Sequence, residues 1–217
     1  DVVNEPVSGQ DRDDDGFYDL WNNSNLELGE NEKVTDFFIW GTRYGDDYPR
    51  KAVELARRYG PDDIKLFVND FNLESDWDCN RKLESLIHWI EYWESDGVTK
   101  FDGIGTQMHI SCYEDEATLA SKKEAIRQAF QKLADTGKLI RISELDMGYV
   151  DADGETVKTT DLTPEQSARM AEFYNFIVAE YLATVPVAQQ YGITIWCMTD
   201  SPENSSWRPG EPTGLWD

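Results

Sequence analysis

Two glutamates, Glu5 and Glu144, have the residue type and setting that best suit acid–base chemistry in this sequence. Each lies at or near the end of a short run of β-branched and apolar residues. Two carboxylates that face the same site, with no metal-binding motif beside them, suit hydrolysis of a glycosidic bond. In that reaction one carboxyl group donates a proton, and the other attacks the sugar or activates water. For either glutamate alone, a solvated strand end is an equally good explanation, because acidic side chains are mostly exposed.

Polar residues also end the other strand-like runs of the sequence. These residues are Asn4 before Glu5, Asn69 with Asp70, Gln107 with His109, Asp146 after Glu144, and Thr199 with Asp200. Parallel strands align their carboxyl ends at one edge of a sheet, so we expect these side chains to converge on one face.

The elements that must position them alternate between strands and helices. Short β-branched runs predict strands at residues 2–4, 64–69, 103–109, 139–145 and 193–199. Helical spacing predicts helices at residues 49–59, 80–95, 116–136 and 164–191. The last helix opens on Thr163 and Pro164, a helix cap followed by a proline in the first turn. This alternation predicts an α/β fold with a parallel sheet.

A (β/α)8 barrel explains the polar strand ends better than a doubly wound sheet does. No GxGxxG or other glycine-rich phosphate loop is present in the sequence. Five strand–helix units are too few to close a barrel. An open parallel sheet would leave its edge strands unpaired and exposed to water. We therefore expect residues 1–217 to be the C-terminal portion of one (β/α)8 catalytic domain. Its earlier strands would lie on a separate chain or beyond an inserted domain.

Composition excludes several classes of partner. Lys and Arg number 20 against 43 Asp and Glu, so the net charge is −23. This disfavours nucleic acids and anionic membranes, which bind basic surfaces. Apolar runs are far shorter than the ~20 residues of a membrane helix. A hydrophobic content of 40% suffices for a core, and the scattered Cys79, Cys112 and Cys197 indicate no disulfide framework.

An acidic turn at residues 11–16, Asp-Arg-Asp-Asp-Asp-Gly, matches the start of a calcium loop. The twelfth position of such a loop is a bidentate glutamate, and here it is Asn22. A solvated acidic turn is the favoured interpretation, and no metal or cofactor is expected.

Five segments resemble, in order, strand motifs of the glycoside hydrolase family 10 endo-β-1,4-xylanases. The segments are Asp-Val-Val-Asn-Glu-Pro (1–6), Leu-Phe-Val-Asn-Asp-Phe-Asn (66–72), Gly-Ile-Gly-Thr-Gln-Met-His (103–109), Ile-Ser-Glu-Leu-Asp (142–146) and Ile-Thr-Ile-Trp-Cys-Met-Thr-Asp (193–200). Ser-Trp-Arg-Pro (206–209) resembles the loop that follows the last strand. The resemblance covers nearly the whole chain but only strands four to eight of the family's barrel, and Phe71 stands where tyrosine is usual.

The resemblance implies a role for each matching position. Glu5 would be the general acid/base and Glu144 the nucleophile of a retaining reaction, in which the charge of Glu144 keeps Glu5 protonated until it is needed. Asn4 would bind the sugar 2-hydroxyl. His109 would contact Glu144, with Asp146 orienting its imidazole ring.

The remaining substrate-binding positions implied by the resemblance are Asn69, Phe71, Gln107, Trp196 and Trp207, with Asn72 also lining the cleft. Indole faces suit the slightly positive C–H groups of a neutral sugar. His88, Trp89 and Trp93 lie in a helical run, and core packing is the favoured interpretation for them.

The leading hypothesis is an endo-β-1,4-xylanase acting on xylan or xylo-oligosaccharides, completed by the N-terminal half of the barrel. Two alternatives remain: an endo-β-1,4-glucanase of the same fold, and a non-catalytic glycan-binding barrel that uses the tryptophans alone. No nucleic-acid partner and no membrane insertion are expected. The resemblance also implies secretion or a cell-surface position, since a polymer cannot enter a cell.

Overall fold

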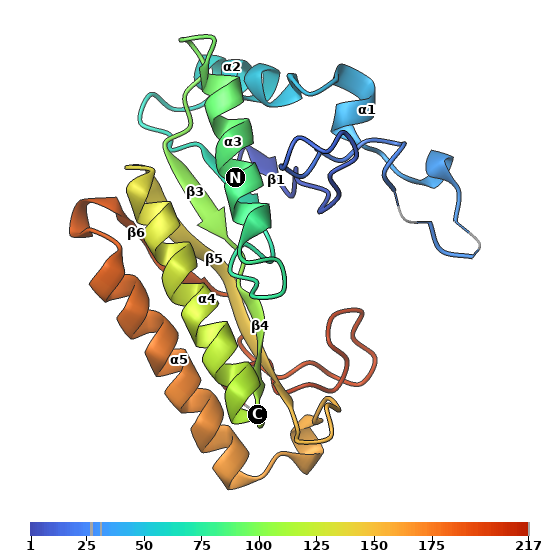
Figure 1. The fold of residues 1–217 in the computed structure, drawn as a ribbon, viewed down its shortest axis with the longest axis vertical. Helices are drawn as coiled ribbons and strands as arrows, with labels where there is room; N and C mark the ends of the chain where they lie inside the picture. Colours follow the sequence, from blue (N-terminus) through green and yellow to red (C-terminus); the bar gives the residue numbers. More distant parts are fainter. Residues whose placement is uncertain (27, 31, 217) are drawn as a thin grey trace. The chain divides into compact units, whose positions relative to one another are not determined.

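The computed structural model describes residues 1–26, 28–30 and 32–216. The chain divides into two compact units: unit 1 comprises residues 1–70 and 81–105, and unit 2 comprises residues 71–80 and those from 106 onward. Each unit alternates strands with helices (Figure 1), in agreement with the predicted α/β class. Among the described helices, none combines the length and apolar composition that a membrane crossing requires.

The described residues of unit 1 form three strands. Its elements are β1 (Val3–Asn4), the 3-10 turn η1 (Val34–Asp36), α1 (Trp40–Tyr44), α2 (Tyr48–Tyr59), β2 (Phe67–Asp70), α3 (Arg81–Glu94) and β3 (Gly103–Thr106), whose last residue belongs to unit 2. Strands β1 and β2 are parallel, with Asn4 opposite Asn69. The ends of the two strands therefore present their polar residues side by side.

Helix α3 supplies much of the unit 1 core. Leu83, Leu86, Ile90 and Trp93 recur every three or four residues, and each is at most 1% exposed. This spacing places them on one face of the helix. The buried indole nitrogen of Trp93 donates to the carbonyl of Asp46 at 2.7 Å.

The aromatic residues on the rest of α3 also pack. The ring of His88 stacks on Phe17 with centroids 4.0 Å apart, and the indole nitrogen of Trp89 donates to the carbonyl of Tyr18 at 2.9 Å. The prediction that His88, Trp89 and Trp93 serve packing is confirmed.

Unit 2 is built from three parallel strands and two long helices. Its elements are β4 (His109–Tyr113), α4 (Glu116–Asp135), β5 (Leu139–Val150), η2 (Thr159–Asp161), α5 (Pro164–Thr184), η3 (Val187–Gln189) and β6 (Gln190–Ile195). Strand β5 pairs in parallel with β4 on one side and β6 on the other. In the β4–β5 register, His109 lies opposite Asp146.

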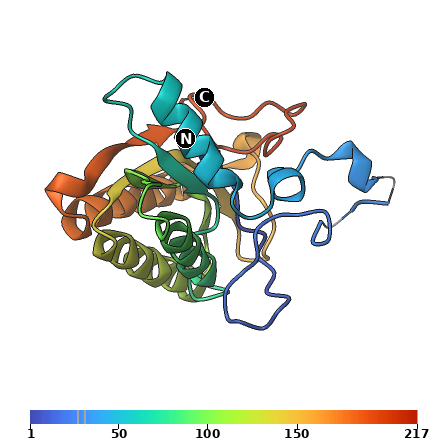
Figure 2. The same ribbon diagram turned by 90° about the horizontal axis from the view of Figure 1, so that it is seen from above.

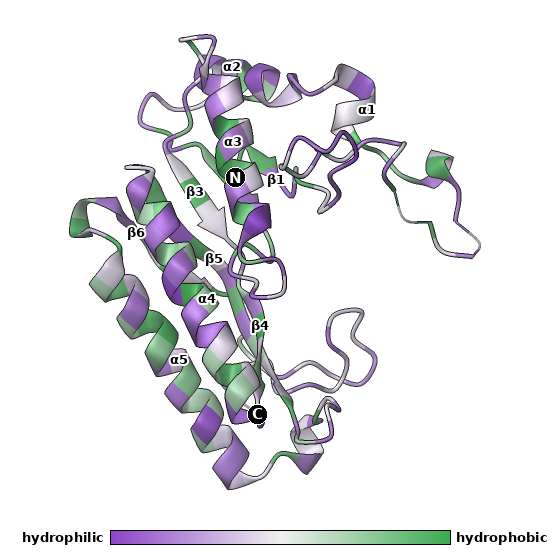
Figure 3. Cartoon of the chain, viewed as in Figure 1, coloured by the Kyte–Doolittle hydropathy of each residue, from purple (hydrophilic) through white to green (hydrophobic). Residues whose placement is uncertain are grey.

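Helices α4 and α5 run side by side against these strands, as Figures 1 and 2 show. Phe130 of α4 meets Tyr181 of α5 edge to face, with centroids 5.7 Å apart. Both side chains are at most 2% exposed. Figure 3 shows hydrophilic and hydrophobic positions alternating along both helices, as expected of helices that bury one face.

Several boundaries differ from those predicted. The single strand predicted at residues 103–109 is two strands, β3 and β4, because Met108 has a left-handed φ of +58° that interrupts the extended backbone. The helix predicted to reach residue 191 ends at Thr184, two residues before Pro186. The last strand accordingly begins at Gln190 and ends at Ile195, and Trp196 follows it. Helix α1 was not predicted.

Candidate active site

Strand β1 of unit 1 ends in Asn4 and Glu5, and Asn69 of β2 holds this end in place. The side-chain amide of Asn69 donates to Oδ1 of Asn4 at 2.8 Å, and the amide of Glu5 donates to the Asn69 carbonyl at 2.7 Å. Asn69 is wholly buried, and a Cβ at Gly105 would collide with its side-chain oxygen. Asn69 thus holds the side chain of Asn4 in place, and its own contact with a sugar stays a prediction.

Glu5 lies just beyond the strand, exposed and with a left-handed φ of +51°. A residue with a Cβ loses about 1–2 kcal/mol in that conformation. Such strain persists where the surrounding structure enforces it, and it recurs at functional positions. The turn directs the Glu5 side chain differently from a continuing strand.

In unit 2, His109 bridges two carboxylates. Its Nε2 lies 3.2 Å from Oε2 of Glu144, and its Nδ1 lies 3.1 Å from Oδ1 of Asp146. The β4–β5 register creates this arrangement, because His109 and Asp146 are direct cross-strand partners and Glu144 is two residues earlier on the same face of β5. The prediction that Glu144 and Asp146 lie at the end of their strand is therefore wrong, since β5 continues to Val150.

Charge around His109 raises the pKa of its imidazole above the ordinary value of 6.5. Burial alone lowers that pKa, but the hydrogen bond and charge of Asp146, followed by those of Glu144, outweigh burial. A neutral imidazole has one N–H to donate and an imidazolium has two. A neutral His109 can therefore donate from only one of Nε2 and Nδ1, and the imidazolium can donate from both.

Two indoles surround the same imidazole. Trp207 meets His109 edge-on at a centroid distance of 4.6 Å, and Trp196 does so at 5.8 Å. Nε1 of Trp207 donates to Oδ2 of the wholly buried Asp146 at 2.6 Å. Trp196 remains 53% exposed and Trp207 39%, so each keeps surface available for a ligand.

The other predicted residues of unit 2 lie close by in the sequence. Gln107 is buried immediately before Met108 and His109. Asn72, with a left-handed φ of +58°, and His109 both line a cavity of about 160 Å³. Phe71 directly precedes Asn72 and is half-buried. The structure thus brings together His109, Glu144, Asp146, Trp196 and Trp207 within unit 2, and Asn4, Glu5 and Asn69 within unit 1.

Comparison with known proteins identifies the family. The family model described as glycosyl hydrolase family 10 matches residues 1–217. The chain belongs to this family. Endo-1,4-beta-xylanase A of Caldicellulosiruptor saccharolyticus is 29% identical over 181 residues, covering 83% of this chain and 48% of that protein. Exoglucanase XynX of Acetivibrio thermocellus is 33% identical over 127 residues, or 58% of this chain and 10% of that protein.

A solved family 10 structure from Paenibacillus barcinonensis superposes with a TM-score of 0.70 at 26% identity, covering 100% of this chain and 56% of that one. The strands and helices of this family 10 chain are thus part of a (β/α)8 barrel, as predicted. The chain spans less than half the length of the first curated relatives it matches, 25% and 48% for two of them.

One residue of this family 10 site was missed by sequence reasoning. Arg208 donates from Nη1 to Oδ1 of Asp146 at 3.2 Å, although only its place in the Ser-Trp-Arg-Pro segment was noted. The signal was an arginine beside a predicted sugar-binding tryptophan, but its partner lies 62 positions earlier in the chain. Only the fold reveals that pairing.

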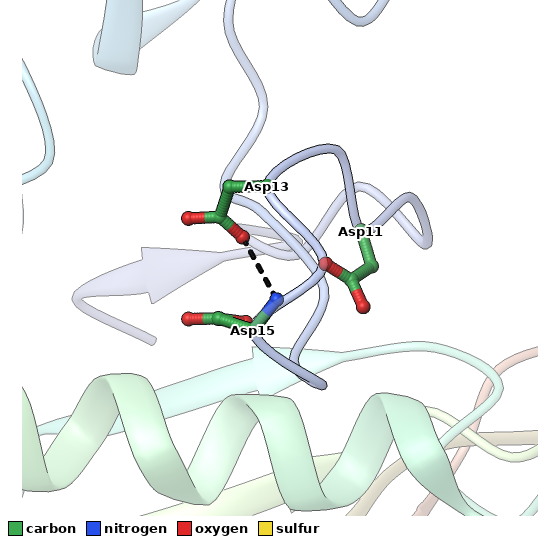
Figure 4. Close-up of side chains that lie close together, drawn as sticks. All are labelled: Asp11, Asp13 and Asp15. Atoms are coloured by element: carbon green, nitrogen blue, oxygen red, sulfur yellow. Dashed lines mark hydrogen bonds between the residues drawn. The ribbon is translucent and has the colours of Figure 1, made fainter.

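The acidic turn of unit 1 folds into a compact cluster. Asp11, Asp13 and Asp15 each place a carboxylate oxygen within 4.8 Å of the others, and Figure 4 shows the three side chains around the turn. Oδ1 of Asp13 accepts the Asp15 amide at 3.3 Å. Arg81 of α3 forms an ion pair with Oδ2 of Asp11, so an arginine already offsets part of the negative charge.

Proposed function

We propose that the protein containing this chain is a retaining, endo-acting hydrolase of β-1,4-xylan. The observation that carries this proposal is the arrangement of Glu144, His109 and Asp146 on adjacent parallel strands, in a chain of glycosyl hydrolase family 10. His109 lies 3.2 Å from Oε2 of Glu144 and so positions the carboxylate that would attack the sugar. Family membership and the similarity to the endo-1,4-beta-xylanase of C. saccharolyticus support xylan as the substrate.

In the proposed reaction, Glu5 protonates the glycosidic oxygen while Glu144 attacks the anomeric carbon, so that the C–O bond to the leaving sugar breaks as an ester to Glu144 forms. Glu5, now a carboxylate, then removes a proton from a water that attacks the same carbon and releases Glu144. This double displacement retains the anomeric configuration and requires the two carboxyl groups to lie ~5–5.5 Å apart.

Substrate recognition follows from the same residues. We assign Asn4 to the sugar 2-hydroxyl, Gln107 and Phe71 to the walls of the cleft, and Trp196 and Trp207 to stacking against sugar rings. The net charge of −23 does not oppose a neutral polysaccharide. Because polymeric xylan remains outside cells, we place the protein in the secreted or cell-surface class.

The chain would form the C-terminal portion of one catalytic barrel, with the N-terminal strands as its partner. The lengths of the relatives support this proposal, and so does a groove of about 540 Å³ in unit 1, which runs along β1 and is lined by Val2, Val3, Trp40, Tyr44 and Leu55 among others. Trp40 is 54% exposed and Tyr44 63%. A preceding strand and helix would cover this apolar surface.

Paired substitutions in the full-length protein test the mechanism. Glu144→Gln and Glu5→Gln should each reduce the release of reducing sugar from xylan by about 10³-fold or more, because both residues act as one unit. Glu155→Gln is the matched control, since Glu155 is an exposed glutamate of unit 2. Full activity of Glu144→Gln would remove the nucleophile assignment.

Two further measurements separate the alternatives. A xylobioside with fluorine at C2 and a good leaving group should trap an ester on the peptide that contains Glu144, which mass spectrometry detects. Faster hydrolysis of β-glucan than of xylan would favour the glucanase, an alternative that the exoglucanase relative keeps open. A wild-type protein that binds xylan without releasing sugar would be a glycan-binding barrel.

A further inference from the structure

Arg208 spreads its guanidinium group over four acceptors in unit 2. Nη1 donates to the Ile110 carbonyl at 2.7 Å and to Oδ1 of Asp146 at 3.2 Å. Nη2 donates to Oγ of Ser111 at 2.9 Å, and Nε donates to Oε2 of Glu211 at 2.9 Å. The Arg208 side chain is 15% exposed and that of Asp146 is wholly buried. A planar guanidinium is well suited to holding several acceptors in fixed directions.

Two backbone features, at Arg208 and Gly148, allow the guanidinium to lie beside Asp146. Arg208 has a left-handed φ of +44°, which is unfavourable by about 1–2 kcal/mol for a residue with a Cβ. Gly148 of β5 lies against the guanidinium, and a Cβ there would collide with Nη2 of Arg208 and come within 2.5 Å of Oε2 of Glu211. A strained residue and a glycine on the facing strand together admit this cation next to Asp146.

The hydrogen bonds of Asp146 indicate how the Arg208 guanidinium affects the protonation of His109. Oδ1 accepts from Arg208 and Oδ2 accepts from Trp207, so both oxygens have donors other than His109. If Arg208 were removed, the buried carboxylate would draw a proton onto Nδ1 of His109, because a buried anion needs a compensating donor. The resulting imidazolium would pair with Glu144 and neutralise it.

We propose that Arg208 is a positioning residue that, by balancing the charge of Asp146, keeps His109 neutral and preserves Glu144 as a nucleophile. The inference rests on the proposed function and names a residue that acts through two others. Charged and titratable groups near His109 come from several elements. They are Glu144 and Asp146 of β5, Arg208 and Glu211 of the C-terminal segment, Tyr174 of α5, Lys122 of α4, and Glu74 after β2.

Titration of the His109 imidazole, followed by NMR, tests the inference independently of catalytic activity. These 217 residues contain two histidines, His88 and His109. In the full-length protein, the signal that is absent from a His109→Gln variant identifies the His109 resonance. Arg208→Gln should move the titration midpoint of His109 upward by about one pH unit, which corresponds to a tenfold change in the protonation equilibrium. Arg208→Lys should restore the wild-type midpoint. Arg169→Gln is the matched control, because Arg169 is a partly buried arginine paired with Glu116 elsewhere in unit 2.

Activity gives the second readout. In this proposal the enzyme is active when His109 is neutral. The acid limb of the kcat/KM profile of Arg208→Gln should therefore shift to higher pH, together with the titration midpoint of His109. The variant should then lose about tenfold at low pH and recover as the pH rises. A purely structural role would lower activity equally at every pH.

Each outcome bears on the inference separately from the proposed function. An unmoved His109 midpoint in folded Arg208→Gln overturns it, even if Glu144→Gln is inactive. A shifted midpoint supports it, even if the substrate proves to be another glycan. If Arg208→Gln does not fold, Arg208→Met, which keeps the length of the side chain, is judged by the same criterion. Failure of Arg208→Lys to restore the midpoint overturns it as well.

Discussion

Competition between two carboxylates for one imidazole makes the stability of unit 2 depend on pH. The pKa of folded His109 is raised because Asp146 and Glu144 together outweigh its burial. An elevated folded pKa means that the folded state binds the proton more tightly than the unfolded state does. The resulting stabilisation is complete below the unfolded pKa of about 6.5 and disappears as the pH rises through the folded value.

We therefore expect the free energy of unfolding of the wild-type protein to exceed that of His109→Gln most at low pH. Urea denaturation at several pH values between about 5.5 and 8.5 measures the difference around the ordinary histidine pKa. His88→Gln shows what loss of an imidazole outside this cluster does. A difference between wild type and His109→Gln that stays constant over this range would contradict the raised pKa.

Residue identities predicted part of this cluster. The spacing of Glu144 and Asp146 and the resemblance of the strand around them led to their grouping with His109, and the structure places the three in contact. Arg208 could not be grouped with them, because its pairing depends on the left-handed turn at residue 208 and on the space beside Gly148. A linear sequence shows neither feature.

At the scale of elements, the start of α5 is held by a reciprocal cap. Oγ1 of Thr163 accepts the Gln166 amide at 3.2 Å, and Oε1 of Gln166 accepts the Thr163 amide at 3.0 Å. Each bond satisfies a backbone donor that the helix itself leaves unpaired. The Thr163 and Pro164 signal in the sequence predicted this boundary.

Thr163→Ala should lower the free energy of unfolding by about 1 kcal/mol, because it removes the acceptor for the Gln166 amide. Chemical denaturation with an unchanged slope against denaturant measures this loss. Thr160→Ala is the matched control, since Thr160 is an exposed threonine three residues earlier in η2. Equal effects of the two substitutions would show that the cap contributes nothing.

Other element boundaries were predicted poorly, for identifiable physical reasons. Apolar residues continue past Thr184, and their helical spacing outweighed Pro186, which is the true stop signal. The break between β3 and β4 depends on the backbone of Met108, a residue type that gives no warning of a left-handed conformation. Periodicity thus predicts the existence of elements better than their ends.

At the scale of the molecule, the net charge of −23 acts on every folded surface. Like charges repel more strongly in the compact state than in the expanded chain. Added salt shortens the Debye length from about 10 Å at 0.1 M to about 3 Å at 1 M and should therefore stabilise the folded state.

Raising sodium chloride from about 0.05 to 0.5 M, a range over which screening strengthens, should increase the thermal unfolding midpoint. Potassium chloride at the same ionic strength is the control, since screening does not depend on the identity of the cation. A flat or falling midpoint would show that the surface ion pairs, which salt weakens, matter more than repulsion.

The family and the barrel class could be read from strand-end motifs, because those motifs are short, local and in register along the chain. The two compact units could not, because they depend on which segments contact one another: residues 71–80 belong with unit 2 although unit 1 flanks them on both sides. Hydrophobic periodicity carries no information about that grouping.

The left-handed backbone at Glu5 has an evolutionary corollary if this residue is the proton donor. Glycine adopts that conformation without penalty, so the variant easiest to fold at position 5 is one without a carboxyl group. Selection for heat tolerance alone would erode the catalyst, and only selection for turnover would preserve it. Position 5 would thus show a trade-off between the stability of the fold and the rate of hydrolysis.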